Sequence, residues 1–531
     1  MPKSIEHPRA ETHARRVRFS PFPRMQFDTD GNDVPPSSAS NFTDPGSAPP
    51  ESNEKERDRS PEVAHLFINN ERIMSRSNEL MSVFDPFTQR LSSRVPCSTH
   101  REVQSAVNAA HAAQQGWDEL GFQSRREYLL KFIDIAVLCQ EVGKTTGEAE
   151  SEIARGLDCI HAACSISPEM AGMYLGSDPT LLQTFFEPIG VCVSIIPFSF
   201  PFMTSFWSIP YALITGNTVV LKPSEKAPSV SHFISDAVLK TGFPRGVFNI
   251  VHGGYSVVQM LILQPRVQAV SFVGSESAAK QVHDIARKAG KRVQAECGGK
   301  NHGVILEDAN MIPTLFAVAG SAFGAAGQRC MSLSVAVFVG NARDWIDKLV
   351  EIAQSMVVGH SGDKDVNIGP LIDRAAKAKV IGFIDRAIQE GAVLLCDGRG
   401  VEVAGYPEGN FIGPTILSGV ETYMECYQSE IFGPVLICIE VQTLEEAIEL
   451  INKNKYGNGC SIFTSAGKHA RTFQRHVNVG QIGINIPLIA PYGTAVRTSN
   501  KGSFMGDRHT PGKTYWPFFT TTKTVSSRWD I

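Results

Sequence analysis

A cysteine flanked by small residues is the first feature of this sequence that could do chemistry. Cys330 lies in "AFGAAGQRCMSLS", where alanine and glycine neighbours would let a substrate carbonyl approach the sulfur closely. A thiol becomes a nucleophile only as its thiolate, which attacks carbonyl carbons well. Taken alone, a buried structural cysteine is the simpler interpretation, since the chain has 11 cysteines and no CxxC pair. The other motifs favour the nucleophile.

One carboxylate could assist such a nucleophile, and another carboxylate and a serine lie in further distinctive segments. Glu296, in "VQAECGGKNHG", stands beside two glycines and could act as a general base on a thiol or a water. A solvated acid at a strand end is the alternative interpretation. Glu430 lies in "SEIFGPV", and Ser199 lies in "IIPFSFPF", where it follows a β-rich run and is surrounded by aromatic residues.

Two further motifs are placed where a nucleotide could bind. "LKPSEKAP" ends a β-rich run with Lys222 and Glu225, which suits ribose hydroxyls because ligands bind at the carboxyl ends of parallel strands. "FVGSES" places Gly274 and Ser275 at a strand-to-helix turn, where backbone N–H groups can meet a phosphate. An ordinary surface loop is the alternative for the first motif. The usual G-x-G-x-x-G fingerprint does not occur.

The elements that must position these residues alternate between strand-like and helix-like segments, which indicates parallel α/β sheets. The strand-like runs are "GVCVSIIPF", "NTVVLKP", "GVFNIVHG" and "AVSFVGS", followed by "HGVILE", "LSVAVFVG", "VLICIEV" and "CSIFTS". Segments such as "PSVSHFISDAVLKTG" between them have a helical pattern. Order is expected to begin near "HLFINNERI", with a turn at Asn69 and Asn70, and Thr99 to Glu102 has the form of a capping box.

Length and charge bound the class of protein. The 531 residues, 42% of them hydrophobic, suggest two to four structural units with a large core. A net charge of -4 gives no electrostatic reason to expect nucleic acid or an anionic membrane surface. No apolar run approaches the length of a membrane span, and no metal site is expected.

The first 62 residues differ from the rest in composition. They contain 10 of the 31 prolines and few aliphatic residues, so they cannot bury enough apolar surface to offset their ordering entropy. We expect a disordered extension over 1–62. Its first 24 residues carry six Lys/Arg and two acids, a weak match to a mitochondrial transit peptide. A cytoplasmic location is therefore expected, with a mitochondrial one as the alternative.

Taken together, these motifs resemble the aldehyde dehydrogenase superfamily from about Ile68 to Trp529. The segments "GKRVQA", "KNHGV", "AFGAAGQRCM", "EIFGPV" and "GSFMGD" are similar to its methylmalonate-semialdehyde dehydrogenase branch. The resemblance implies an NAD-binding domain and a catalytic domain, each with a parallel sheet, and a β oligomerisation arm. We expect the NAD-binding domain at 63–298, with part of the arm near 168–187, the catalytic domain at 299–487 and the C-terminal arm at 488–531. A homodimer or homotetramer is expected by analogy.

The resemblance also implies the roles of the site residues. Cys330 matches the nucleophile, Glu296 the position of the base that activates water, and Ser199 a position in the oxyanion hole. Arg155 and Arg329 match two arginines that hold a substrate carboxylate, for which a guanidinium fork is suited. The positions implied to bind NAD are Pro197, Phe198, Lys222, Glu225, Gly274, Ser275, Glu430 and Phe432. An acid at 225 would repel a 2′-phosphate, so NAD is favoured over NADP.

Three positions depart from the branch. It usually has Asn at 296, Asn at 199 and Gly at 279, where this chain has Glu296, Ser199 and Ala279. Glu296 favours hydrolysis of a cysteine thioester to a free acid, whereas the branch motifs and arginines favour transfer of the acyl group to coenzyme A. Ser199 leaves a third alternative open, a weakly active or inactive cofactor-binding protein. Arg155 has its own alternative, a structural pair with Glu150 or Glu152.

Overall fold

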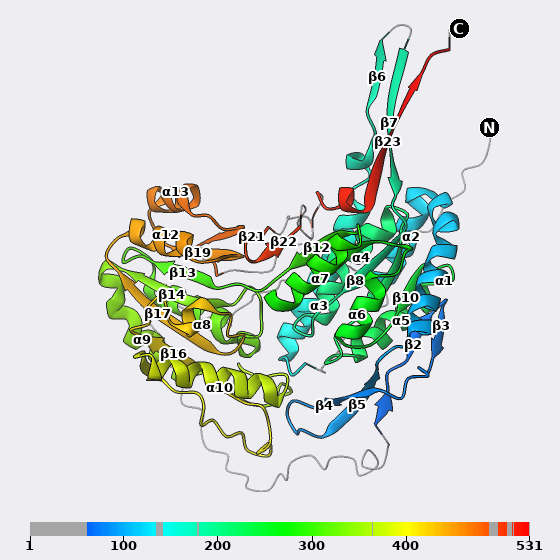
Figure 1. Ribbon diagram of the computed structural model, residues 1–531. Helices are drawn as coiled ribbons and strands as arrows, with labels where there is room; N and C mark the ends of the chain where they lie inside the picture. The colour runs from blue at the N-terminus through cyan, green and yellow to red at the C-terminus, as the bar shows by residue number, and fades with distance from the viewer. Residues whose placement is uncertain are drawn as a thin grey trace, which may run out of the picture. The chain divides into compact units, whose positions relative to one another are not determined.

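Two large sheets, both built mainly from parallel strands, form the core of this computed structural model (Figure 1). The structure describes residues 61–133, 142–177, 180–363, 365–487, 498–506, 512 and 514–529. These residues belong to one compact unit, Ser60–Ile531. The expected disordered extension lies outside the described residues, apart from Pro61 and Glu62, and Glu62 already belongs to strand β1 (Glu62–Val63).

The first sheet has eight strands in the order β22-β12-β11-β8-β9-β10-β2-β3. Its strands are β2 (Leu66–Ile68), β3 (Glu71–Ile73), β8 (Val191–Ile195), β9 (Thr218–Lys222), β10 (Phe248–Ile250), β11 (Val267–Val273), β12 (Arg292–Glu296) and β22 (Phe504–Met505). The strands from β12 to β10 pair in parallel, and the outer strands pair antiparallel. All residues of β8 and β9 are buried, as expected for strands covered by helices on both faces.

Helices connect and cover this sheet. They are α1 (His100–Glu119), α2 (Gly121–Ile133), α3 (Thr146–Cys164), α4 (Pro201–Ile214), α5 (Ser229–Thr241), α6 (Tyr255–Ile262) and α7 (Glu276–Lys288). α3 packs along α4, which is buried over its whole length and follows directly on the segment containing Ser199. Four strands of this sheet end just before residues discussed below. Ser199 follows β8 and Glu225 follows β9, while Ser275 follows β11 and Cys297 follows β12.

The second sheet has seven strands in the order β15-β16-β17-β14-β13-β19-β20, all parallel except the β15–β16 pair. They are β13 (Asn301–Ile305), β14 (Leu333–Val339), β15 (Val393–Cys396), β16 (Thr415–Ser418), β17 (Val435–Val441), β19 (Gly459–Phe463) and β20 (Gln481–Ile484). Its helices are α8 (Met311–Phe323), α9 (Ile346–Gln354), α10 (Arg374–Gln389), α11 (Glu425–Gln428), α12 (Leu444–Lys453) and α13 (Gly467–His476). The loop before central strand β14 carries Cys330.

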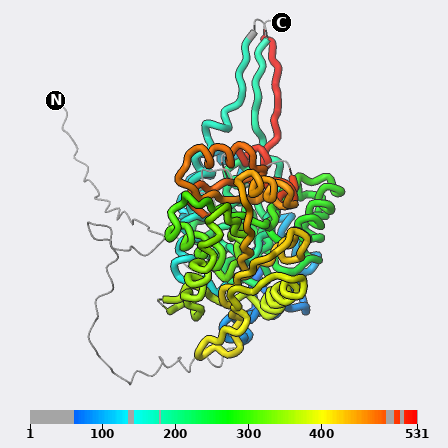
Figure 2. The backbone as a smooth tube through the Cα atoms, turned by 90° about the vertical axis from the view of Figure 1, so that its left-hand side faces the viewer, coloured from blue at the N-terminus to red at the C-terminus, as the bar shows by residue number. Residues whose placement is uncertain are grey.

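A three-stranded antiparallel arm extends away from the two sheets (Figures 1 and 2). It consists of β6 (Tyr174–Ser177), β7 (Thr180–Pro188) and the C-terminal β23 (Thr520–Ser527), with β7 in the middle. The 488–531 segment is not an arm alone, because it also supplies β22 to the first sheet and β21 (Asn500–Lys501), which pairs with β18 (Tyr456–Gly457). The remaining sheet joins β1, β5 (Leu91–Pro96) and β4 (Leu80–Phe84).

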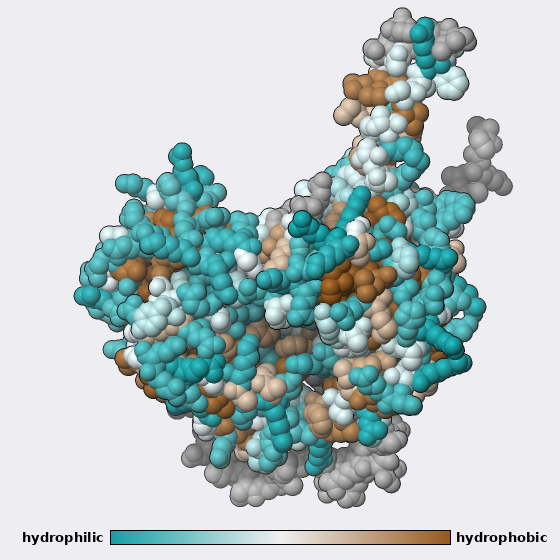
Figure 3. Space-filling model, viewed as in Figure 1, coloured by the Kyte–Doolittle hydropathy of each residue, from teal (hydrophilic) through white to brown (hydrophobic). Residues whose placement is uncertain are grey.

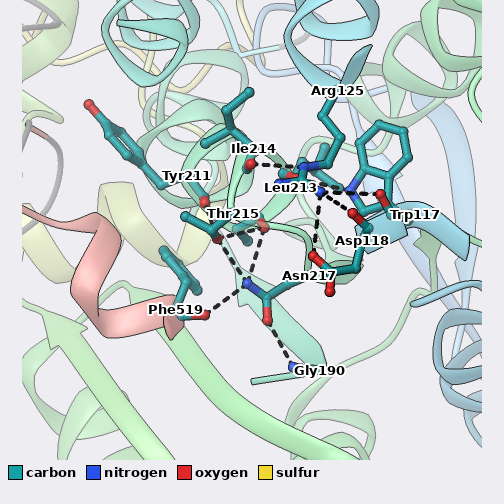
Figure 4. Close-up of polar contacts among 11 residues, drawn as sticks. Trp117, Asp118, Arg125, Gly190, Tyr211, Leu213, Ile214, Thr215, Asn217 and Phe519 are labelled. Atoms are coloured by element: carbon teal, nitrogen blue, oxygen red, sulfur yellow. Dashed lines mark hydrogen bonds and ion pairs between the residues drawn. The ribbon is translucent and has the colours of Figure 1, made fainter. Parts of the chain in front are cut away.

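A buried polar cluster attaches the base of the arm to the first sheet (Figure 4). The Asn217 side chain accepts a hydrogen bond from Gly190 N–H at 2.8 Å and donates to the Phe519 carbonyl at 2.9 Å. Gly190 precedes β8, Asn217 precedes β9, and Phe519 precedes β23. One amide side chain thus ties the start of the C-terminal arm strand to the amino ends of two central strands.

Several local predictions are confirmed. Asn69 and Asn70 form the turn between β2 and β3 with left-handed φ angles of 56° and 60°. The capping box at the start of α1 is complete, since Glu102 N–H donates to the Thr99 hydroxyl and Thr99 N–H donates to the Glu102 carboxylate. Among the described residues, no helix combines the length and the apolarity needed to cross a membrane.

Candidate active site

Cys330 lies in a tight loop between the turn Gly324–Gly327, in which Ala325 and Ala326 have left-handed φ angles of 50° and 51°, and β14. Its side chain is partly buried, and its backbone carbonyl accepts two hydrogen bonds. Asn301, the first residue of β13, donates through Nδ2 at 2.9 Å, and Asn458, just before β19, donates through Nδ2 at 2.8 Å. The loop is therefore held by one residue at the start of β13 and one just before β19 in the second sheet.

The preceding residues of this loop are packed against neighbouring loops. Gln328 is buried, donates to the Pro370 carbonyl at 3.2 Å and accepts from Ile372 N–H at 2.9 Å. Gly327 has φ 68° and lies so close to Gly433 that a Cβ would be 2.1 Å from its carbonyl oxygen. Glycine is therefore required at 327, and the small residues flanking the cysteine serve loop packing.

Glu296 is the last residue of β12, and its side chain is 1% exposed. Its backbone is fixed on both sides, because β22 pairs with it through Phe504 and its carbonyl accepts from Gly274 N–H at 3.1 Å. Its carboxylate Oε2 accepts a hydrogen bond from the Ser499 hydroxyl at 3.1 Å. The alternative of a solvated strand-end acid does not fit this burial.

Glu296 and Cys330 belong to the same hydrogen-bond network. The Ser499 Oγ lies 3.1 Å from Glu296 Oε2 and 2.9 Å from Asn458 Oδ1, and Asn458 Nδ2 donates to the Cys330 carbonyl. Ser499 is 1% exposed. The network joins the carboxyl end of a strand in the first sheet to the cysteine loop of the second.

Glu430 approaches the loop that follows Glu296. Its Oε1 accepts from Gly299 N–H at 3.2 Å, and a Cβ on Gly298 would lie 2.0 Å from its Oε2. Burial raises the pKa of Glu430 to about 7, although the Gly299 N–H and Lys379 favour the charged form. The two expected site carboxylates therefore contact one glycine-rich loop.

Ser199 is buried, at 8% exposure, between β8 and α4. The start of α4 is capped from another helix, since the Glu152 carboxylate accepts from Phe202 N–H at 2.8 Å and Met203 N–H at 3.2 Å. Lys144 binds Glu152 at 2.5 Å, with its ammonium 3.7 Å from the centre of the Phe200 ring. This buried pair fixes the segment on which Ser199 lies.

The two expected carboxylate-binding arginines are placed near helix α3. Arg329 forms an ion pair with Glu148, which also completes the capping box with Thr145 at the start of α3. Arg155 lies two helical turns after Glu148, hence on the same face of α3, and its charge acts on Asp158. Glu152, one acid expected to pair with Arg155, binds Lys144 and the α4 amides.

Lys222 and Glu225, both expected to hold a ribose, form an ion pair. Lys222 ends β9 and is buried, with its Nζ 3.0 Å from Glu225 Oε2. Burial opposes ionisation of the carboxyl, but the charge and hydrogen bond of Lys222, a backbone N–H and the charge of Lys226 together hold the pKa of Glu225 below its usual value. The pair therefore presents an anionic acceptor and a cationic donor at the carboxyl end of a parallel strand.

The expected phosphate turn differs from prediction in one respect. Gly274 N–H, expected to face a phosphate, donates to the Glu296 carbonyl and extends the β11–β12 ladder. Ser275 caps α7 by accepting from Ala278 N–H at 3.4 Å. A phosphate at this turn would therefore use the N–H groups at the start of α7.

Aromatic residues from both sheets meet near the site. The rings of Phe198 and Phe432 are edge to face, with centres 6.0 Å apart. Phe432 has a left-handed φ of 60°, which is unusual for a bulky residue. Pro197 and Phe198 follow one residue after the end of β8, so this contact joins the carboxyl end of β8 to the Glu430 loop.

Several residues of this site were not identified from the sequence. They are Asn301, Asn458, Ser499, Glu148, Glu152 and Gln328. Asn301 lies within "KNHGV", which was noted only as a branch motif. The others act over separations such as the 203 residues between Glu296 and Ser499, and a single sequence carries no signal for such pairs. In the described part of the chain, His, Cys, Asp and Glu form no grouping of three suited to a metal ion.

The fold brings the Cys330 loop of one parallel sheet to the carboxyl end of β12 in the other, and the family model gives the class of protein. The chain belongs to the aldehyde dehydrogenase family, whose model matches residues 73–525. It is an NAD-dependent aldehyde dehydrogenase, an oxidoreductase that acts on a small-molecule aldehyde.

Among similar proteins, methylmalonate-semialdehyde dehydrogenases recur. The mitochondrial acylating enzyme of Arabidopsis thaliana is 43% identical over 480 residues, covering 88% of this chain and 79% of its own. The mitochondrial methylmalonate-semialdehyde/malonate-semialdehyde dehydrogenase [acylating] of Rattus norvegicus is 41% identical, covering 87% and 89%.

Solved structures similar to this chain also include methylmalonate-semialdehyde dehydrogenases. The methylmalonate-semialdehyde dehydrogenase of Oceanimonas doudoroffii has a TM-score of 0.86 and 36% identity, covering 89% of this chain and 99% of its own. A structure from Sinorhizobium meliloti 1021, described as this enzyme complexed with NAD, has a TM-score of 0.87 and 34% identity, with the same coverage. The predicted family, fold class and activity are confirmed.

The residues present here fit NAD. The Lys222–Glu225 pair offers a donor and an acceptor for a ribose diol at a strand end, where such ligands bind. The start of α7 is capped by Ser275 and lies beside that edge of the sheet, so its N–H groups can serve a pyrophosphate.

Proposed function

We propose that this enzyme oxidises an aldehyde that carries a carboxylate, with Cys330 as the nucleophile, and releases the free acid. The observation that carries the proposal is the chain of hydrogen bonds from Glu296 through Ser499 and Asn458 to the Cys330 carbonyl. It supports a base and a nucleophile acting at one place. A carboxylate there can take the proton from a water that attacks a thioester.

The chain's own residues would act in a fixed order. The Cys330 sulfur bonds to the aldehyde carbon, and negative charge moves to the carbonyl oxygen. The Cys330 N–H and the Ser199 hydroxyl stabilise that oxyanion. NAD, when bound, supplies the hydride acceptor. Water deprotonated by Glu296 then releases the acid from the Cys330 thioester, and the sulfur leaves as thiolate.

The NAD-binding residues would divide between the two ends of the cofactor. Lys222 and Glu225 would hold the adenosine ribose, and the N–H groups at the start of α7, which follow Gly274 and Ser275, would hold the pyrophosphate. The residues proposed for the nicotinamide end are Pro197, Phe198, Glu430 and Phe432. The Phe198–Phe432 contact and the position of Glu430 against Gly298 support this grouping.

A carboxylate on the substrate would be recognised by Arg329 and Arg155. Arg329 immediately precedes the nucleophile, and its guanidinium lies against Gly324 at the base of the same loop. The ion pair with Glu148 holds the guanidinium in place. Methylmalonate semialdehyde and malonate semialdehyde, which appear in the names of the relatives, have this chemistry.

Transfer of the acyl group to coenzyme A is the second candidate. The relatives of Arabidopsis and rat carry the word acylating in their names, and this observation favours the same outcome here. The opposing observation is Glu296, since a carboxylate at this position favours water as the second nucleophile. Coenzyme A would then be a co-substrate instead of water.

Product analysis separates the two candidates. Malonate semialdehyde and a neutral aldehyde of similar size should be supplied with NAD, with and without coenzyme A, and NADH, free acid and acyl-CoA measured. The proposal expects NADH and free acid without coenzyme A and faster turnover of the semialdehyde. An enzyme that turns over only with coenzyme A would establish the second candidate, and NADH formation with neither aldehyde would contradict both.

The arm supports assembly into a homodimer or homotetramer. Its exposed apolar residues include Met173, Tyr174, Leu175 and Phe185, which are 57%, 69%, 53% and 47% exposed, and Figure 3 shows apolar side chains on the arm. Such a patch on a projecting sheet favours a protein partner. The names of the relatives favour the mitochondrial alternative over the cytoplasmic expectation.

A further inference from the structure

The Glu296 backbone and its carboxylate are held by different groups. Its backbone is fixed by the β12–β22 pairing and by the Gly274 N–H, and Cys297 N–H donates to the Ser503 carbonyl at 2.9 Å. The side chain can still rotate about its own bonds. The Ser499 hydroxyl, 3.1 Å from Oε2, is a donor placed to hold the carboxylate in one orientation.

Ser499 lies between two acceptors but has one proton to donate. The Glu296 carboxylate oxygen lies on one side and the Asn458 amide oxygen on the other, at 2.9 Å, while the Asn458 nitrogen is engaged by the Cys330 carbonyl. A bond to a charged acceptor is the stronger one, so Ser499 donates to Glu296 while Glu296 is ionised. All three side chains are buried, so bulk water does not screen this choice.

We propose that Ser499 is the positioning residue for Glu296 and that it reverses its hydrogen bond during hydrolysis. The inference rests on the proposed role of Glu296 as the base. Before the step, Ser499 holds the ionised carboxylate in place. A water O–H bond breaks, the oxygen bonds to the thioester carbon, the proton goes to Glu296, and the carbon–sulfur electron pair leaves on Cys330.

After the step, the hydroxyl can turn. With the proton on Oε2, Glu296 donates to Ser499 Oγ, and Ser499 donates its own proton to Asn458 Oδ1. Every member then has a partner in both protonation states, which a fixed donor such as a backbone N–H could not provide. Asn458 also donates to the Cys330 carbonyl, so the same network holds the cysteine loop and the Glu296 carboxylate in fixed positions relative to each other.

Paired variants of Ser499 test this inference. Ser499→Thr keeps the hydroxyl, Ser499→Val keeps the shape of threonine without it, and Ser499→Ala removes it. Ser503→Ala is the matched control, because Ser503 is a fully buried serine of the same segment whose hydroxyl accepts from Gly457 N–H at 3.2 Å. The full-length enzyme is assayed with malonate semialdehyde and NAD, with and without coenzyme A.

The expected results separate chemistry at the sulfur from hydrolysis. Ser499→Ala and Ser499→Val should keep the first burst of NADH but release acid about 10- to 100-fold more slowly, and should raise the share of acyl-CoA when coenzyme A is present. Ser499→Thr and Ser503→Ala should stay within about threefold of wild type. If Ser499→Ala does not fold, the threonine–valine comparison alone decides.

Other outcomes overturn the inference. Equal acid release by the threonine and valine variants, or an equal loss in Ser503→Ala, would show that the hydroxyl has no positioning role. Glu296→Asn distinguishes this from a failure of the proposed function. If Glu296→Asn hydrolyses slowly while Ser499→Val is normal, only the inference fails; if Glu296→Asn hydrolyses normally, the proposed function fails.

Discussion

Arg329 and Glu148 form an ion pair that joins the loop of the nucleophile to the first turn of helix α3. Both side chains are largely buried, at 27% and 18% exposure. The positive charge of Arg329, which is adjacent to Cys330, is therefore neutralised by Glu148. A substrate carboxylate that binds Arg329 must compete with Glu148 or share the guanidinium with it, since the fork has five N–H donors.

Glu148→Gln should strengthen binding of a carboxylate substrate. Glutamine can still cap α3, so the helix is retained while the charge is lost. The KM for malonate semialdehyde should fall about two- to tenfold, and the KM for a neutral aldehyde should not change. In contrast, Arg329→Leu should raise the KM for the semialdehyde alone. Parallel changes for both aldehydes would assign the pair a purely structural role.

Cys330→Ala should abolish aldehyde oxidation and leave NAD binding intact. The loop backbone is held by Asn301, Asn458 and Gln328, none of which contacts the Cys330 side chain in these bonds, so the fold should persist. NADH formation and NAD titration measure the two effects. Cys396→Ala, which removes another partly buried thiol, is the control. Appreciable turnover by Cys330→Ala would assign the nucleophile elsewhere.

Ser199→Asn should raise turnover about tenfold or more, because asparagine offers a fixed amide N–H to the oxyanion in place of a rotating hydroxyl. The NAD dissociation constant should stay nearly constant. Because Ser199 is buried, at 8% exposure, the larger asparagine side chain must also fit the space around it. A fall in turnover across a panel of aldehydes would mean that the pocket is shaped around serine.

Glu225→Gln should weaken the preference for NAD. Lys222, Lys226 and a backbone N–H together lower the pKa of Glu225 despite its burial, so the carboxylate is charged and repels a 2′-phosphate. The neutral amide should raise kcat/KM for NADP relative to NAD about tenfold. Steady-state rates with both cofactors give the ratio, and an unchanged ratio would remove Glu225 from cofactor selection.

Glu430→Gln should make stability less dependent on pH. Burial raises the pKa of Glu430 from 4.5 to about 7, so between these values the folded protein holds a proton that the unfolded chain has released. Stability therefore falls as pH rises through this window. Denaturant unfolding at about pH 5 and about pH 8 should show a smaller fall for the variant than for wild type. An equal fall would place the titrating group elsewhere.

Local elements could be predicted from the sequence because their signals are local. The runs that became β8, β9 and β11 are apolar and end at Pro, Gly or Ser, and the Thr99–Glu102 box needs residues three apart. The family resemblance supplied the roles of the site residues, which stay predictions, as do the domain boundaries.

The contacts that orient the site could not be predicted in this way. Arg329 and Glu148 are 181 residues apart, and Glu296 meets Ser499 only because β22 returns to pair with β12. The Gly274 N–H, expected to face a phosphate, completes a ladder with a strand that begins 18 positions later, at Arg292. Each of these three contacts depends on the order of strands in the sheets, which the periodicity of hydrophobic residues along the sequence does not determine.

The burial of Glu296 also constrains how such a site can arise by single substitutions. A carboxylate introduced at a position 1% exposed without a hydrogen-bond donor would destabilise the fold, whereas a serine introduced at 499 beside an amide would be tolerated. An ancestor with asparagine at 296 would therefore reach this arrangement most easily with the serine first and the glutamate second.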